Sequence, residues 1–187
     1  MNSNKTVSAE TENKRVVILS QINYHIEIDL LWEDGEENTM KIRAMTIDDY
    51  EQVYALWKQI KGFGMRSIDD SREGVSRFLE RNPNISVVAV EDEKVVGAIL
   101  CGHDGRRGCL YHVCVAPDYR RRGIGKAMVV FCMDALKREQ INKVTLIAFT
   151  KNDIGNAFWH NVGWVQREDL NYYDFVLNKE NITAFNQ

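Results

Sequence analysis

The spacing of apolar residues predicts a chain that alternates between strands and helices. Near the N-terminus apolar side chains occupy every second position, as Ile22, Tyr24, Ile26, Ile28 and Leu30. This period of two is typical of a strand. Residues 16–31 are therefore predicted to form an appended strand or hairpin, which either extends the edge of a sheet or pairs with another subunit. A polar start, residues 1–15, is predicted to be disordered, so that residues 1–39 form an extension of a domain at 40–187.

Helical spacing begins after Met40. A Thr46–Asp49 capping box precedes apolar residues three or four positions apart, which are Tyr50, Val53, Trp57 and Ile60. A second helix is predicted to begin at Asp69 or Asp70 and to stop before Pro83. Trp57 and Tyr50 are interpreted as core residues of the first helix.

The remaining pattern is a meander followed by a crossover. Strands are predicted at 85–91, 94–103, 109–116 and 142–150, helices from about 124 to 140 and at 153–163, and a last hairpin from Trp164 to Asn178. The meander indicates antiparallel pairing, whereas the strand–helix–strand unit over 109–150 requires a parallel pair. The fold class predicted is α/β, with a mixed, mostly antiparallel sheet and helices on both faces.

Net charge, apolar runs and cysteine spacing limit the kinds of partner and the compartment to be expected for this chain. The formal net charge of −3 argues against a general nucleic-acid binder, and the apolar runs are too short to span a membrane. The four cysteines form no C-x-x-C pair, and Cys101, Cys114 and Cys132 lie in apolar stretches. They are interpreted as core thiols of a reducing, cytoplasmic compartment, and no metal site is predicted.

Three arginines run into a glycine-rich helix start at residues 120–125, RRRGIG. A helix start favours an acidic or hydroxyl side chain, so this basic cluster predicts an anion supplied from outside. The free N–H groups of a first helical turn bind phosphate well. No Walker loop is present, and Met128 stands where a dinucleotide fingerprint needs glycine. What remains is R-x-x-G-x-G, formed by Arg120, Gly123 and Gly125.

This segment resembles the pyrophosphate loop of the GCN5-related N-acetyltransferases, the GNAT superfamily, which bind acetyl-CoA. The stretch 152–164 resembles the family's second cofactor segment, with Asn152, Gly163 and Trp164 at matching positions. The resemblance covers about residues 40–178 and leaves residues 1–39 unexplained. It implies a GNAT-type acyl-CoA N-acyltransferase fold, in which strands 109–116 and 143–150 splay apart to form a slot for pantetheine.

The resemblance also implies the cofactor residues. They are Val113, Cys114, Val115, Arg120, Arg121, Arg122, Gly123, Ile124, Gly125, Lys126, Asn152, Asn156, Phe158 and Trp159. The backbone of Val113 and Val115 would pair with pantetheine, and the amides of residues 121–126 would hold the pyrophosphate. Asn152 matches a family asparagine that contacts pantetheine or stabilises the loop.

The catalytic groups are less clearly indicated. An amine attacks the thioester directly in this family, and a backbone N–H near a strand bulge, assigned here to Val115, would polarise the carbonyl. Tyr111 is the candidate for substrate contact or proton relay. Histidine titrates nearer neutral pH, but alternation places His112 on the face opposite Tyr111 unless a bulge intervenes, so a core or hydrogen-bonded His112 is favoured.

The departing thiolate has no obvious acid. Trp159 replaces the family's usual tyrosine, and indole is not an acid near neutral pH. His160, Tyr172, Tyr173 and water remain as alternatives.

The acceptor site is assigned to the segment KGFGMRS, residues 61–67, where Phe63 and Met65 would be apolar lining and Arg66 would meet a carboxylate. A merely flexible loop is the alternative.

The function predicted is acetyl-CoA-dependent N-acetylation of a primary amine of a small molecule, a peptide N-terminus or a lysine. An acyl-CoA-binding sensor without turnover is the second hypothesis, because of Trp159. The third is an interaction module that assembles, for example as a homodimer, through strand 16–31.

Overall fold

The computed structural model describes residues 15–22, 25–32 and 40–186, with side chains from residue 40 onward. Nearly all of the segment predicted to be disordered lies outside these ranges. The strands are β1 Arg15–Ile22, β2 His25–Trp32, β3 Met40–Ala44, β4 Gly64–Arg66, β5 Val87–Glu91, β6 Lys94–His103, β7 Gly108–Val115, β8 Val144–Leu146 and β9 Thr183–Phe185. The α-helices are α1 Tyr50–Gln59, α2 Arg72–Arg81, α3 Ile124–Arg138 and α4 Asp153–Asn161, and short 3-10 turns occur at Ile47–Asp49 and Pro117–Tyr119.

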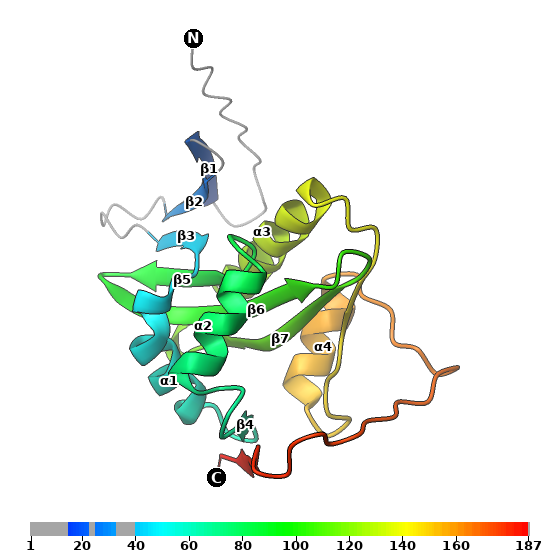
Figure 1. Ribbon diagram of the computed structural model, residues 1–187. Coiled ribbons are helices and arrows are strands. Elements are labelled where there is room, and N and C mark those ends of the chain that lie inside the picture. The colour runs from blue at the N-terminus through cyan, green and yellow to red at the C-terminus, as the bar shows by residue number, and fades with distance from the viewer. Residues whose placement is uncertain (1–14, 23–24, 33–39, 187) are drawn as a thin grey trace.

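Seven of the described strands form one sheet in the order β1-β2-β3-β5-β6-β7-β8 (Figure 1), and β4 and β9 form a separate two-stranded sheet. Every neighbouring pair is antiparallel except β7 and β8, which are parallel. The prediction of a mixed, mostly antiparallel sheet is therefore confirmed. β1 and β2 form a hairpin that pairs with β3 and so lengthens one edge of the sheet.

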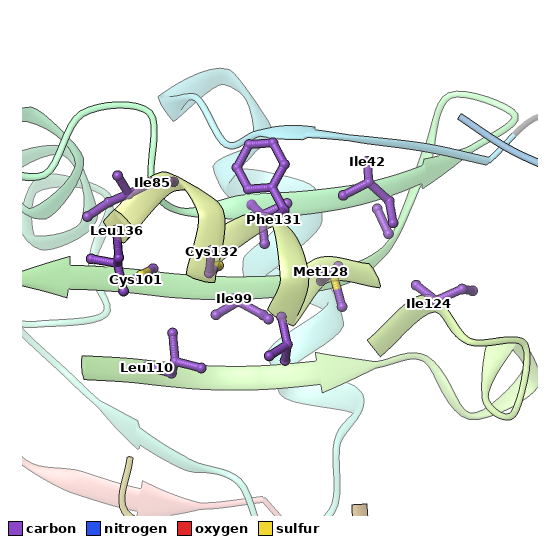
Figure 2. Packing of buried hydrophobic residues seen from close by; sticks show 14 of the residues in the cluster. Ile42, Ile85, Ile99, Cys101, Leu110, Ile124, Met128, Phe131, Cys132 and Leu136 are labelled. Atoms are coloured by element: carbon purple, nitrogen blue, oxygen red, sulfur yellow. The ribbon is translucent and has the colours of Figure 1, made fainter. Parts of the chain in front are cut away.

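The sheet separates two apolar clusters. On one face α3 contributes Met128, Phe131, Cys132 and Leu136, which pack on strand residues such as Ile99 (Figure 2). On the other face α1 and α2 contribute Val53, Trp57 and Val75. β6 is buried on both faces, which explains its nearly unbroken apolar sequence. Trp57 and Tyr50 are core residues, as predicted.

The cysteines are all free, and Cys101, Cys114 and Cys132 are buried. Burial raises the pKa of the Cys114 thiol to about 12. Burial also raises the pKa of the Cys132 thiol. All three buried cysteines are core residues, as predicted. Among the described residues, no helix is both long enough and apolar enough to cross a bilayer.

Two predicted elements differ from the structure. The second helix begins at Arg72, because the Ser71 hydroxyl caps it by accepting a hydrogen bond from Gly74 N at 3.1 Å. The hairpin predicted over 164–178 is wrong: this segment contains no strand, and Tyr173, Phe175 and Leu177 are exposed. Its apolar alternation resembles a strand, but the chain instead continues past it to β9, which pairs with β4.

The predicted capping box ties the first helical segment to the sheet. Thr46 N donates to Asp49 Oδ2 at 2.9 Å, and the Arg43 guanidinium makes two further bonds to the same carboxylate at 2.7 and 2.8 Å. Burial acts to raise the pKa of Asp49, but the bonds from Arg43 and Thr46 outweigh it and leave the pKa below its ordinary value of 3.8. Asp49 therefore stabilises the folded chain as a carboxylate.

Replacing Asp49 by Asn is expected to lower the free energy of unfolding near neutral pH by about 1–3 kcal/mol, because a buried charge-assisted pair is lost. The contribution of Asp49 is complete above pH 3.8 and is lost as the pH falls through the lower pKa of the folded state. Urea denaturation across this range should therefore show the two proteins converging in acid. The exposed pair Arg167–Asp169 supplies the control variant, Asp169→Asn, for which a smaller loss of stability is expected. If the stability difference between wild type and Asp49→Asn grew in acid, the role assigned to Asp49 would be contradicted.

Candidate acyl-carrier and acceptor site

The parallel strands β7 and β8 separate after three residue pairs. Their register runs from Gly108–Val144 to Leu110–Leu146 and then ends, while β7 continues to Val115. β8 is much shorter than the strand predicted over 142–150, because residues 147–150 turn away toward α4. Beyond Leu110, one side of β7 therefore has no strand partner among the described residues.

A β-bulge determines which backbone groups of β7 face this opening. Across β6 and β7, Ala98 is opposite Cys114 but Leu100 is opposite Tyr111, so β7 contains one extra residue. His112 takes the left-handed conformation, with φ of 50°. Ala116 N donates to Val96 O at 2.8 Å, so in the antiparallel pattern Cys114 also faces β6, whereas Val113 and Val115 turn their N–H and C=O groups outward.

The bulge also corrects the predicted position of His112. The Tyr111 ring meets Phe78 of α2 edge-on at 5.9 Å between centroids, and the His112 ring lies 4.7 Å from Trp57 and 4.9 Å from Phe63. Both side chains are thus on the α1–α2 face, and strict alternation was wrong because the extra residue resets it. His112 is hydrogen-bonded, as favoured: its Nε2 lies 2.6 Å from Asp70 Oδ1.

Tyr111 is suited to donating a hydrogen bond. Burial of part of the ring raises its pKa well above the ordinary value of 10, and the neighbouring Cys109 adds to the effect. About half of the residue, 48%, is nevertheless exposed. A phenol with this pKa is protonated at neutral pH, so it is a poor base.

The start of α3 carries unpaired backbone donors. Gly123 is the N-cap with φ of 79°, and no acidic residue lies in the first turn. The first bond of the helix runs from Ala127 N to Gly123 O at 3.1 Å, so the N–H groups of residues 124–126 have no partner inside the helix.

The three arginines of the motif have different partners. Arg122 forms a bidentate pair with the buried carboxylate of Glu91, at 2.5 and 3.2 Å, and so anchors the loop to β5. Arg120 Nε donates to Val115 O at 3.1 Å. Arg121 is exposed and has a positive φ of 63°. Lys126 is also exposed, so the basic side chains surround the helix start without all reaching it.

Gly125 allows α4 to approach the start of α3. A Cβ at this position would lie 3.3 Å from the Phe158 ring and 3.7 Å from Val115. Phe158 packs against Trp159, which in turn contacts Trp164, with centroids 4.9 and 5.0 Å apart. The aromatic side chains of Phe158 and Trp159, two of the predicted cofactor residues, therefore lie beside Gly125. The alternatives for the thiolate acid, His160, Tyr172 and Tyr173, are exposed side chains.

The two predicted asparagines hold α4 in place. Asn152 caps the helix by accepting from Gly155 N at 3.0 Å. Asn156 Nδ2 donates to Phe149 O at 3.0 Å and to Thr150 O at 3.3 Å, which joins α4 to the chain that leaves β8. Of the two family roles given for Asn152, the loop-stabilising one matches these contacts.

The predicted acceptor segment, residues 61–67, contains the short strand β4 between turns. Phe63 contacts His112, Met65 is buried in the core, and Arg66 is exposed at the end of β4. β4 pairs with β9, and Asn186 Nδ2 donates to Trp57 O at 2.7 Å. Sequence reasoning missed this C-terminal strap, residues 178–186, because two three-residue strands over a hundred positions apart carry no readable pattern.

The comparisons with known proteins agree with this geometry. The model of the Acetyltransferase (GNAT) family matches residues 47–164. Acetyltransferase SG1711 of Sodalis glossinidius is 35% identical over 114 residues, which are 61% of this chain and 79% of that protein. Acetyltransferase plu1384 of Photorhabdus laumondii is 33% identical over 114 residues, 61% of this chain and 78% of its own length.

Solved structures share the fold at low identity. Ard1 from Thermoplasma volcanium superposes with a TM-score of 0.59 at 20% identity, over 67% of this chain and 82% of that one. AAC(6')-Iy in complex with a bisubstrate analog, CoA-S-monomethyl-acetylneamine, gives 0.59 at 18% identity, over 73% of this chain and 98% of that one. The PaiA N-acetyltransferase from Thermoplasma acidophilum, in complex with coenzyme A, gives 0.57 at 18% identity, over 65% and 87%.

The role of Asn152 as a helix cap can be tested by stability. Asn152→Ala is expected to cost about 0.5–2 kcal/mol of unfolding free energy, because Gly155 N loses its acceptor. Asn152→Asp, which keeps an acceptor oxygen, should retain wild-type stability in the same denaturant titration. Equal stability of all three proteins would mean that the cap contributes nothing.

Proposed function

Because the chain belongs to the GNAT family of acetyltransferases, which use acetyl-CoA, we propose that it transfers the acetyl group directly to a primary amine of a small molecule or a peptide. The observation that carries the proposal is the separation of β7 from β8 beside the free N–H groups at the start of α3. One side of the opening offers strand-like backbone groups for an extended pantetheine. The other offers donors for a diphosphate.

In the proposed complex the diphosphate lies on the N–H groups of residues 124–126, where the helix dipole favours an anion. Arg121 and Lys126 are exposed beside it, and Arg122 holds the loop through Glu91. Pantetheine pairs with the outward backbone of Val115. Arg120 donates to Val115 O at 3.1 Å. When the cofactor binds, its guanidinium would leave this carbonyl to pantetheine and donate to the diphosphate.

The chemistry needs a donor for the thioester oxygen. The sequence assigned this role to Val115, but the bulge lies at His112, so the outward N–H nearest to it is that of Val113. We assign the thioester oxygen to Val113 N–H and pantetheine to Val115. One such donor is worth roughly 3–4 kcal/mol in the transition state, and holding the two reactants together can supply roughly 7–11 kcal/mol.

The acceptor amine is proposed to approach from the α1–α2 face. Tyr111, His112 and Phe63 lie together there, and Arg66 is exposed nearby on β4. An aromatic surface with a protonated phenol suits an amine carried on an apolar or hydroxylated group. Met65, which is buried in the core, supports this wall from behind and does not touch the acceptor.

Placing a carboxylate at the start of α3 should abolish acetyl-CoA binding. Gly125→Glu is the cleaner variant, because Gly123 has a positive φ and Gly123→Glu would also strain the backbone. Calorimetric titration with acetyl-CoA is expected to show no binding by Gly125→Glu and weakened binding by Gly125→Ala, which adds only a Cβ. Lys137→Glu, which places a carboxylate at the other end of α3, is the control and should bind normally. Retained affinity in Gly125→Glu would contradict the placement of the diphosphate.

A screen of primary amines distinguishes the enzyme from a sensor. Purified protein with acetyl-CoA is expected to release free thiol, detected with a disulfide dye, only when a suitable amine is added. Candidates should include polyamines, aminoglycosides, amino acids and peptides with free N-termini or lysines. Tight acetyl-CoA binding without thiol release from any of them would favour the sensor, in agreement with Trp159 at the position of the family's tyrosine.

A further inference from the structure

We propose that Asp70 fixes the tautomer of His112, so that Nδ1 of the imidazole is the base that removes a proton from the attacking amine. This inference rests on the proposed function. His112 is then a catalytic residue and Asp70 a positioning residue. The pair joins positions 42 residues apart in the sequence and connects the bulge of β7 to the turn before α2.

Asp70 is held more firmly than a surface carboxylate. It is 4% exposed, and its two oxygens have different partners: Oδ1 lies 2.6 Å from His112 Nε2, and Oδ2 accepts from Arg66 N at 2.6 Å. Its backbone carbonyl accepts from the Tyr50 hydroxyl at 3.0 Å. The orientation of the carboxylate is therefore set by the fold before His112 meets it.

The His112 ring is equally constrained. Trp57 and Phe63 pack against it at 4.7 and 4.9 Å between centroids, and its side chain is 11% exposed. A non-glycine residue in the left-handed conformation persists where the surroundings impose it. The backbone of His112, with φ of 50°, is thus held at the bulge in a conformation that is uncommon for non-glycine residues.

The two nitrogens of the ring have different surroundings. Nε2 faces a carboxylate, which accepts only, so the neutral ring keeps its proton on Nε2 and presents a lone pair at Nδ1. Among the described residues Nδ1 of His112 has no hydrogen-bond partner. The buried side-chain nitrogen that lacks a partner is Trp57 Nε1, so Nδ1, which also lacks one, is not a buried atom. Nδ1 is therefore the accessible nitrogen of the pair.

The proton balance follows from this arrangement. A substrate ammonium gives one proton to Nδ1, and the imidazolium that forms is stabilised by the Asp70 carboxylate. The freed amine forms the N–C bond as the C–S bond breaks, and the proton lost from nitrogen on acylation leaves with the thiolate as free thiol. No metal or redox partner is needed, and His112 returns its proton to solvent.

The substitution Asp70→Asn should reverse the tautomer. The Arg66 N–H requires an acceptor, so it would hold the oxygen of the new amide, and the NH₂ group of that amide would then face His112 Nε2. Nε2 must accept, so the ring proton moves to Nδ1 and the base is lost while the shape is kept. A general base contributes roughly 100- to 10,000-fold to a rate. Asp70→Asn is therefore expected to lower kcat by at least about 100-fold and to leave the affinity for acetyl-CoA unchanged.

The test uses the full-length protein and two independent readouts. The side-chain nitrogen shifts of the four histidines, measured by NMR at a pH where the rings are neutral, report the tautomer directly, and the signal absent from His112→Asn identifies His112. Wild type should carry the proton on Nε2, and Asp70→Asn should carry it on Nδ1. Asp134→Asn, the same change at a half-exposed carboxylate of α3, is the control and should alter neither the tautomer nor kcat.

The outcomes separate this inference from the proposed function. If wild type transfers acetyl to an amine but His112→Asn retains its kcat, or the tautomer is the same in wild type and Asp70→Asn, the inference is overturned and the function stands. If wild type transfers acetyl to no amine, the proposed function fails, and the tautomer measurement still decides whether Asp70 orients the ring. If Asp70→Asn does not fold, the loss of kcat in His112→Asn serves as the kinetic test. The tautomer of wild type then tests the role of Asp70, because a proton on Nδ1 of His112 would refute it.

Discussion

One extra residue in β7 is the constraint on which the site depends. Without the bulge at His112, the backbone of residues 112 and 114 would face the opening beside β8, and His112 would not face the α1–α2 layer. With it, Val113 and Val115 face outward and His112 contacts Trp57. A single left-handed residue therefore decides which backbone groups of β7 face outward and which side chains face the α1–α2 layer, and so which groups the proposed function assigns to the carrier and to the acceptor.

The two halves of the site make different demands on the chain. In the proposed site the carrier half uses backbone: the outward edge of β7 and the N–H groups at the start of α3, where Gly125 lets Phe158 approach and Gly123 takes a positive φ. The acceptor half uses side chains, with Asp70 and His112 brought together from distant elements. Backbone recognition tolerates wide sequence change, which agrees with a shared fold at an identity of 20%.

The same distinction explains what the sequence could predict. The strand, loop and helix around Gly123 are contiguous, so periodicity and glycine placement predicted the bounds of β7 and α3 closely and located the motif. The face of His112 was wrong because a bulge in the partner register cannot be read from one strand. Asp70 was only a helix-start candidate, since its contact with His112 depends on how α2 docks. The hairpin over 164–178 failed because its alternation fits a strand that here has no pairing partner among the described strands.

The acceptor half also extends beyond the part of the chain that defines the family. The family model ends at residue 164, whereas the strap at 178–186 pairs with β4 through β9, and Asn181 accepts from Ile68 N at 2.9 Å. These bonds hold the chain from Phe63 to Asp70, and with it the carboxylate that meets His112. The residues proposed for the acceptor side thus depend on a segment outside the family match. On the proposed function, family membership indicates the carrier, and this chain's own C-terminus would help to select the amine. The acceptor should accordingly be sought by experiment on this chain and not inferred from the amines named for its structural neighbours.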